Sequence, residues 1–233
     1  MVTEAIIVGS GRSLLGSGLG EKIDSFEHVI RFNGSDLYLE KYKEDVGTKT
    51  TVFVLNSNRR TIRGVYKKIK HGGLLTNKQI KSVIITATIG NPRAWIRRSL
   101  AGKRLINHLK KNKDIGWRML THGQARRTLK DYSLDTKARW SVKRRRRVHK
   151  NRYWGFTSGF IVLCNAIKKY DKVYLCGFDW LAKDGAWRKP KDGRRGHFYN
   201  NRKLPMHRHR LSWESKLIKQ LIIKSKKIEI LDP

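Results

Sequence analysis

The chain has 233 residues, about one and a half typical domains, so we expect one compact domain over residues 1–233 rather than two independent ones. Hydrophobic residues make up 39% of the chain, with 7 Trp and 8 Tyr, so the chain can bury a sizeable core and is not a disordered tail. The 53 Lys and Arg against 18 Asp and Glu give a net charge of +35, so an anionic partner is the first expectation.

Five short apolar runs predict buried strands, and each ends at a Gly, an Asn or a small polar residue. The runs are residues 5–8, 28–32, 51–55, 83–86 and 172–176. Segments with helical spacing follow, notably residues 160–167 and 211–222. This alternation predicts an α/β fold: a single Rossmann-like domain with a mostly parallel twisted sheet, helices on both faces, and ligands outside the carboxyl ends of the strands.

The turn after the first strand is a candidate phosphate site. Gly9, Ser10 and Gly11 would let the backbone approach a phosphate, and the helix expected next would offer free N–H groups. Leu14 stands where the dinucleotide fingerprint requires a third glycine, and Asn33 rather than an acidic residue follows the second strand. These departures disfavour a nicotinamide cofactor, and they leave open a plain turn that binds no ligand.

Charge is concentrated in the middle of the chain. Residues 1–58 hold 6 Lys and Arg against 8 Asp and Glu, whereas residues 93–152 hold 21 Lys and Arg against 3 Asp. Four consecutive arginines occupy residues 144–147. We interpret residues 93–152 as a strongly basic insert. It could bind a polyanion, an anionic membrane surface or an acidic glycan, or form only a solvated basic face.

A second candidate anion site precedes the helical segment at residues 160–167. Thr157, Ser158 and Gly159 supply hydroxyl and N–H groups where a helix begins, and a helix start stabilises a phosphate. Ser158 is equally consistent with a simple N-cap.

Two histidines near the carboxyl terminus are candidates for proton transfer. His197 is followed by two aromatic residues, and His209 precedes Glu214 by five positions. Histidine is the usual general base near neutral pH, and Glu214 could fix the tautomer of His209 if a helix starts just after that histidine. His207 is interpreted as a solvated residue. The sequence shows no metal-ligand pattern, so we expect catalysis without a metal.

The cysteines and the first residues of the chain indicate the cellular compartment of the protein. Cys164 and Cys176 cannot form a disulfide framework and lie in apolar surroundings, which indicates a reducing compartment. No apolar run reaches membrane-spanning length, and residues 1–4 lack the order of a signal peptide. We therefore expect a cytoplasmic protein or one bound peripherally to a membrane.

Taken in order, these segments resemble the sialyltransferases of glycosyltransferase family 29. The segments similar to the long motif of that family are residues 8–20, 23–24, 29–33 and 45–50, and those similar to its short motif are residues 156–159 and 173–178. His197 with its aromatic neighbours is similar to the third motif, and His209 with Glu214 is similar to the very short motif, His-x-x-x-x-Glu.

The sequence also departs from the family pattern. Ser10 stands where the family usually has an Asn that contacts the nucleotide, and the long-motif cysteine that pairs with one in the short motif is missing. Residues 157–159, Thr-Ser-Gly, look more like the bacterial sialyltransferases of family 42. Because the amino-terminal membrane anchor is also missing, the chain looks like a soluble microbial or viral version.

The resemblance implies a GT-A-like sialyltransferase variant. Such an enzyme moves sialic acid, or a related nonulosonic acid, from a CMP-activated donor to a glycan hydroxyl with inversion, and it needs neither a metal nor a cofactor. By this resemblance His209 would be the general base, His197 would bind the leaving phosphate, and Glu214 would brace the helix or orient His209. The residues that would bind the donor are Gly9, Ser10, Gly11, Asn33, Asn56, Thr157, Ser158 and Gly159.

A nucleic-acid-binding protein on a degenerate transferase fold is the alternative. The net charge of +35 and three aromatic residues near the arginine run, Trp140, Tyr153 and Trp154, are typical of nucleic-acid surfaces. No recognised nucleic-acid module accompanies these residues.

Overall fold

The computed structural model of the chain describes residues 2–57, 61–65, 79–86, 100–134, 156–179 and 211–231. Within these ranges seven strands form one parallel sheet in the order β5-β4-β3-β2-β1-β6-β7. The strands are β1 (Glu4–Val8), β2 (His28–Phe32), β3 (Val52–Asn56), β4 (Ser82–Thr86), β5 (Gly116–Leu120), β6 (Lys172–Cys176) and β7 (Ile228–Ile230).

Helices connect the strands and cover both faces of the sheet. The α-helices are α1 (Gly20–Asp24), α2 (Lys43–Val46), α5 (Leu100–Lys111), α6 (His122–Asp131), α7 (Ser158–Lys169) and α8 (Leu211–Ser225). Three short 3₁₀ helices are η1 (Arg12–Leu14), η2 (Ser35–Tyr38) and η3 (Glu40–Tyr42), and residues 61–65 are also helical.

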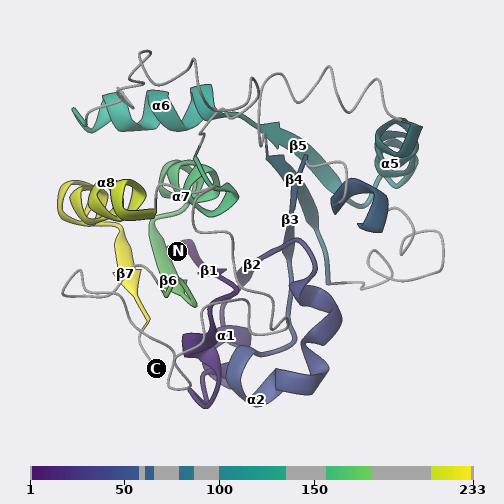
Figure 1. Ribbon diagram of the computed structural model, residues 1–233, viewed down its shortest axis with the longest axis horizontal. Coiled ribbons are helices and arrows are strands. Elements are labelled where there is room, and N and C mark those ends of the chain that lie inside the picture. Colours follow the sequence, from purple (N-terminus) through teal and green to yellow (C-terminus); the bar gives the residue numbers. More distant parts are fainter. Residues whose placement is uncertain are drawn as a thin grey trace, which may run out of the picture.

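The strands are apolar along their length because each one is buried on two sides. In β1, Ala5 and Ile7 join a core cluster with α6, α7 and α8, whereas Ile6 and Val8 join a cluster with α1 and α2 on the opposite face. A further cluster on that opposite face packs α5 against β3 and β4. In Figure 1, α6, α7 and α8 lie together at the upper left, α5 lies at the right, and α1 and α2 lie below.

The expected parallel α/β fold is confirmed, and the five predicted strands are all present, with boundaries within one residue of those expected. The chain runs outward from β1 to β5 on one side and then returns to β6 on the other side of β1. The strand order therefore reverses between β1 and β6. In open α/β sheets such a reversal is where ligands bind, outside the carboxyl ends of the strands.

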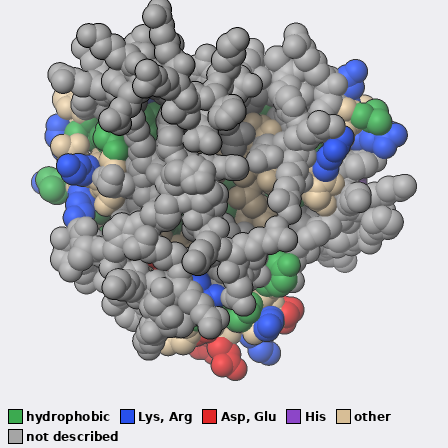
Figure 2. All heavy atoms as spheres, viewed as in Figure 1, with side chains coloured by type: hydrophobic (Ala, Val, Ile, Leu, Met, Phe, Trp, Pro, Cys, Tyr) green, Lys and Arg blue, Asp and Glu red, His purple; other side chains and the backbone are tan. Residues whose placement is uncertain are grey.

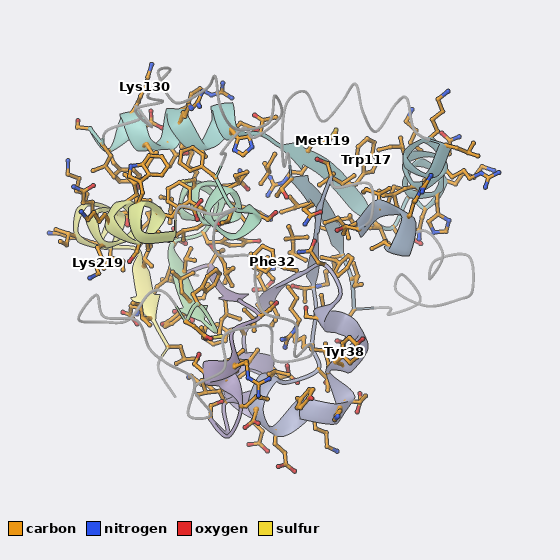
Figure 3. All side chains as sticks on the ribbon, in the orientation of Figure 1. Phe32, Tyr38, Trp117, Met119, Lys130 and Lys219 are labelled. Carbon is orange, nitrogen blue, oxygen red and sulfur yellow. The ribbon has the colours of Figure 1, made fainter. Side chains whose placement is uncertain are left out.

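The sequence patterns predict neither β5 nor β7. β5 is the edge strand of the sheet in the described residues, and Gly116 and Arg118 on it are exposed while Trp117 and Met119 are half-buried (Figure 3). It therefore lacks the continuous apolar run of a central strand. Residues 100–134 of the basic segment thus contribute α5, β5 and α6 to the fold, and the rest of that segment lies outside the described residues.

Both cysteines are free and buried, Cys164 in α7 and Cys176 at the end of β6. Burial raises the pKa of both thiols, that of Cys176 to about 12, so neither is an activated nucleophile. Among the helices of the described residues, none combines the length and the apolar character that crossing a bilayer requires.

Candidate functional site

The turn after β1 packs directly against the loop after β6. Gly9 N donates to Cys176 O at 2.8 Å, and Gly11 N donates to Gly177 O at 2.8 Å. A Cβ on Gly9 would overlap the carbonyl of Gly177. Glycine at position 9 is therefore required because two backbone segments of the protein meet there, whether or not a ligand also approaches.

The carboxylate of Asp179 accepts hydrogen bonds from the backbone amides at the start of η1. Its Oδ2 accepts from Arg12 N at 2.9 Å, and its Oδ1 accepts from Ser13 N at 3.3 Å and from Ser13 Oγ at 2.6 Å. Burial raises the pKa of Asp179, whereas these hydrogen bonds lower it. The expectation of free N–H groups on a helix here is wrong, because the turn is a short 3₁₀ helix whose amides already bind a carboxylate of the chain.

Asn33 and Asn56 meet at the carboxyl ends of β2 and β3. Asn33 directly follows β2 with a left-handed φ of 54°, and its Oδ1 accepts from Asn56 N at 3.1 Å. Its own N donates to Val54 O at 2.7 Å. Within the described residues Asn33 Nδ2 has no acceptor, so this half-buried amide can donate to a ligand.

The first turn of α7 lies at the same edge of the sheet. Thr157, not Ser158, is its N-cap, since Thr157 Oγ1 accepts from Phe160 N at 3.2 Å. The hydroxyl of Ser158 instead lies 2.7 Å from Thr86 Oγ1, at the end of β4. In the described part of the chain the amides of Ser158 and Gly159 have no acceptor, so the positive end of this 12-residue helix is open to an anion.

Aromatic packing fixes the backbone of this helix start. A Cβ on Gly159 would lie 2.8 Å from Cε1 of Phe178, which follows β6. Phe178 in turn packs edge-on against Phe32, with ring centroids 6.4 Å apart. Phe32, labelled near the centre of Figure 3, belongs to the same core cluster as the buried side of α7. Glycine at position 159 therefore lets α7 begin close to the ends of β2 and β6.

Glu214 joins the first turn of α8 to the start of α7. Only 1% of Glu214 is exposed, and its carboxylate accepts from Thr157 N at 2.6 Å and from Thr157 Oγ1 at 2.7 Å. Burial raises the pKa of Glu214 to about 7, although the two hydrogen bonds lower it. His197 and His209 lie outside the described residues, so their predicted roles and any contact between Glu214 and His209 stay predictions.

Comparison with known proteins identifies the family. The chain matches Glycosyltransferase family 29 (sialyltransferase) over residues 2–226. The protein belongs to glycosyltransferase family 29. Its membership agrees with the resemblance seen in the sequence motifs, and it extends that resemblance over almost the whole chain.

Known relatives match a short segment of this family 29 protein. Beta-galactoside alpha-2,6-sialyltransferase 2 of Bos taurus is 47% identical over 51 residues, which are 22% of this chain and 10% of that protein. Beta-galactoside alpha-2,6-sialyltransferase 1 of Mus musculus is 45% identical over 51 residues, which are 22% of this chain and 12% of that protein. The matched segment thus spans about a tenth of the length of these relatives.

Solved structures share the fold of this family 29 protein over nearly its whole length. A mammalian sialyltransferase in complex with Gal-beta-1-3GalNAc-ortho-nitrophenol aligns with a TM-score of 0.56 at 17% identity, covering 99% of this chain and 70% of that chain. A second mammalian sialyltransferase structure aligns with a TM-score of 0.53 at 18% identity, covering 99% of this chain and 69% of that one. The expected sialyltransferase-like fold is therefore confirmed.

Among the residues similar to the family's long motif, two carboxylates support loops rather than face the strand ends. Asp45 accepts from Gly16 N at 2.8 Å and from Gly18 N at 3.1 Å. Asp24 accepts from Thr48 N at 2.8 Å and from Lys49 N at 2.9 Å. These two carboxylates therefore fix the loops at residues 16–18 and 48–49.

The predicted donor-site residues are linked to one another along the carboxyl edge. Asn33 Oδ1 accepts a hydrogen bond from Asn56 N, and Asn56 lies opposite Thr86 in the pairing of β3 with β4. The hydroxyl of Thr86 is in turn hydrogen-bonded to that of Ser158. The sequence reasoning missed Thr86 and Asp179, although each is a polar residue at or just beyond the end of a predicted strand. That position was the signal that could have found both.

The described residues hold no group of three His, Cys, Asp or Glu side chains that could bind a metal ion. Metal-independent catalysis without a cofactor remains a prediction, to be tested directly.

Positive charge is concentrated on the α5 to α6 region of this family 29 protein. Within residues 100–134 all nine Lys and Arg are exposed, against two Asp. The face drawn in Figure 2 shows its acidic side chains gathered at the bottom, where Figure 1 places α1 and α2. Lys130 on α6 and Lys219 on α8 point outward in Figure 3. Among the described residues, residues 100–134 therefore carry a clear excess of exposed positive charge, which favours anionic partners.

Proposed function

We propose that this protein transfers sialic acid, or a related nonulosonic acid, from a CMP-activated donor to a glycan hydroxyl with inversion at the anomeric carbon. Membership of family 29 and the shared fold support this assignment. The single structural observation that carries it is the open first turn of α7, where the amides of Ser158 and Gly159 have no acceptor in the described residues and the Ser158 hydroxyl contacts Thr86 at the end of β4.

The departing CMP phosphate would bind at this helix start. Amides fixed in place at a helix terminus stabilise negative charge that develops on a leaving group, and they do so without reorganising. Asn33 Nδ2, at the end of β2, would add a further donor. The predicted donor residues Gly9, Ser10 and Gly11 would contribute the facing wall of the site.

The hydroxyl of Ser158 would bind a different part of the donor. Either oxygen can be the donor in the 2.7 Å contact between Thr86 Oγ1 and Ser158 Oγ, but with Thr86 Oγ1 donating its single proton to Leu55 O at 3.3 Å, Ser158 Oγ would be the donor. The oxygen of Ser158 keeps lone pairs that can accept a hydrogen bond. It would therefore accept a hydrogen bond from a ribose hydroxyl of the nucleotide rather than donate one to the phosphate.

His209 would act as the general base. It would take the proton of the acceptor hydroxyl as that oxygen bonds to the anomeric carbon, while the bond from this carbon to the phosphate oxygen breaks and CMP leaves with the electron pair. His197 would hydrogen-bond the departing phosphate. A correctly placed base contributes about 10²–10⁴ in rate.

The tether between α8 and α7 supports this role for His209. Two residues after His209, α8 begins at Leu211, and Glu214 binds Thr157 from the first turn of α8. Trp213 also stacks on Phe156, with ring centroids 5.2 Å apart. A base carried just ahead of α8 would thus be presented near the start of α7. Glu214 serves this positioning and transfers no proton.

The proposal is tested by CMP release from CMP-sialic acid with and without a glycan acceptor. We expect slow release alone, faster release with acceptor, and loss of both in His209→Ala. His207→Ala is the matched control, since it removes the same side chain two positions away and should leave turnover unchanged. Unchanged turnover in His209→Ala would remove the base assignment.

Donor class and metal dependence are tested separately. A screen of CMP-sugars, with UDP- and GDP-sugars as controls, should give turnover only with CMP-sugars. Addition of EDTA should leave the rate unchanged. A rate that falls with EDTA and returns with a divalent cation would contradict metal independence.

We further propose that the basic segment, residues 93–152, binds an anionic partner on the acceptor side. The nine exposed Lys and Arg of residues 100–134 support this. Binding to an acidic glycan, to anionic vesicles and to duplex or single-stranded DNA should be compared over a salt series. If binding to every partner falls only with ionic strength, charge alone explains it. A specific loss of DNA binding on changing Trp140 or Tyr153 favours the nucleic-acid alternative.

A further inference from the structure

Two aspartates connect the segments flanking β1 and β6 at opposite edges of the sheet. At the amino edge, Asp171 Oδ2 accepts from Thr3 N at 2.8 Å and from Thr3 Oγ1 at 2.9 Å. At the carboxyl edge, Asp179 accepts from the amides of Arg12 and Ser13 and from the hydroxyl of Ser13. The two aspartates therefore make the same kind of contact, but only Asp179 does so at the carboxyl edge, where open α/β sheets generally bind ligands.

The site of Asp179 is shaped to receive a carboxylate. A Cβ on Gly11 would overlap Asp179 Oδ1, so the glycine leaves the space that the carboxylate fills. Asp179 is half-buried, whereas Asp171 is exposed. Both oxygens of Asp179 accept backbone amides, which is how a protein binds a phosphate or carboxylate ligand at a turn after a strand.

A donor phosphate cannot use the same amides. Gly9 N, Gly11 N, Arg12 N and Ser13 N each already donate to an acceptor within the protein. A second anion at the amides of Gly11, Arg12 and Ser13 would find each of them already donating and would meet the negative charge of Asp179. At the start of α7, by contrast, the carboxyl of Glu214 accepts only from the N and Oγ1 of Thr157, and the amides of Ser158 and Gly159 have no acceptor among the described residues.

We propose that Asp179 is a positioning residue that acts as a built-in anion of the turn at residues 9–13. It takes up the amides of Arg12 and Ser13, holds Ser10 in place for the nucleotide, and leaves the start of α7 as the position for the donor phosphate. The part that concerns the nucleotide rests on the proposed function, and the part that concerns the amides does not.

The first experiment measures CMP affinity by titration calorimetry in the full chain, with Asp179→Ala compared with its matched control Asp171→Ala. Both variants should lose thermal stability to a comparable degree, because each removes a carboxylate that links β1 to β6. Only Asp179→Ala should bind CMP about tenfold more weakly, the equivalent of one lost polar interaction. Equal losses of CMP affinity in the two variants would show a purely structural role and overturn the proposal.

A double-mutant cycle tests whether Asp179 acts through Ser10. Ser10→Ala should weaken CMP binding in the wild-type background and have little further effect in Asp179→Ala, whereas its effect should persist fully in Asp171→Ala. Additive effects of Ser10→Ala and Asp179→Ala would refute the positioning of Ser10. If the wild type itself binds no CMP, the proposed function and this part of the inference fail together.

Inorganic phosphate probes the amides without any nucleotide. Removing Asp179 opens the amides of Arg12 and Ser13, so phosphate should raise the melting temperature of Asp179→Ala more than that of the wild type or of Asp171→Ala. The amide protons of residues 12 and 13 should also exchange faster in Asp179→Ala when phosphate is absent. An identical phosphate response in all three proteins would contradict the role of Asp179 as a built-in anion, whatever the result with CMP.

Discussion

The carboxylate of Glu214 accepts hydrogen bonds from both the backbone N and the Oγ1 of Thr157, at 2.6 and 2.7 Å. This contact joins the first turns of α8 and α7, and Glu214 is almost fully buried in making it. Burying a carboxylate costs free energy of folding unless it is hydrogen-bonded. The two hydrogen bonds from Thr157 offset this cost for Glu214. The ionisable carboxyl of Glu214 therefore fixes the start of α7, which carries the candidate anion site.

Glu214 should make the protein less stable as pH rises from 4.5 to about 7. Burial raises its pKa from 4.5 to about 7, so over this range the folded state holds a proton that the unfolded state has released. The stability contributed by this proton is fully present below pH 4.5 and is lost by about pH 7, up to about 3 kcal/mol.

Urea unfolding of Glu214→Gln across this pH range checks the assignment, since glutamine has no proton to lose. The variant should show a flatter dependence of stability on pH than the wild type. Glu40→Gln, which removes an exposed carboxylate on η3, should keep the wild-type slope. If Glu214→Gln and the wild type show the same slope, the buried carboxyl does not titrate in this range.

The close approach of the β1 and β6 loops predicts a severe effect of Gly9→Ala. A Cβ at position 9 would overlap the Gly177 carbonyl, and neither backbone segment can yield without breaking the bond from Gly9 N to Cys176 O. We expect a loss of about 3 kcal/mol or more, measured by chemical unfolding.

Gly64→Ala is the matched control for this substitution. Gly64 lies in the helical residues 61–65, and a Cβ there would meet nothing within 4 Å. Alanine should therefore stabilise the protein by about 0.5–1 kcal/mol. A Gly9→Ala variant as stable as Gly64→Ala would mean that the two loops are not in contact.

Much of the fold follows from the sequence, and the reason lies in how each strand is buried. Residues 5–8 are apolar at every position because both faces of β1 are covered, so the strand is visible without any structure. β5 is not visible in this way, since it lies at the edge of the described sheet and two of its five residues are exposed. β7 has only three residues, too few for a periodic pattern.

The sequence predicts those residues of the candidate site that lie at the end of a strand. Asn33 and Asn56 follow or end a strand, so the sequence alone puts them at the ligand edge. The contacts from Asp179 to Arg12 and from Glu214 to Thr157 join residues 167 and 57 positions apart. No local pattern reports such pairings, because they arise only when the sheet brings β1, β6 and the helix starts together.

Asn33 should separate folding from donor binding. Asn33→Asp keeps an oxygen that can accept from Asn56 N and tolerates the left-handed φ of 54°, but it lacks the Nδ2 donor and adds a negative charge. We expect near wild-type stability with CMP affinity lowered about tenfold or more. Asn33→Ala should lose the affinity and also about 1–2 kcal/mol of stability, because alanine resists this backbone conformation. Wild-type CMP affinity in Asn33→Asp would exclude Asn33 from the donor site.

Thr86 and Ser158 should act as one unit in binding the nucleotide. Thr86 is fully buried, and its hydroxyl contacts only Leu55 O and Ser158 Oγ among the described residues. Thr86→Val keeps the shape of the side chain but removes the group that orients Ser158, so CMP affinity should fall about three- to tenfold, as in Ser158→Ala. Because the two hydroxyls share one interaction, the double variant should bind CMP no more weakly than Ser158→Ala alone.

Thr128→Val provides the matched control for Thr86→Val. Thr128 is also buried, and its hydroxyl contacts Gln124 O at 3.3 Å and Cys164 O at 3.2 Å, within the packing of α6 on α7 and away from the strand ends. Each Thr→Val change should cost about 1 kcal/mol of stability, since each removes a buried hydroxyl from backbone carbonyls. Only the change at Thr86 should lower CMP affinity. If both variants lower CMP affinity equally, or if Thr86→Val and Ser158→Ala are additive, the orientation of Ser158 by Thr86 has no part in binding the donor.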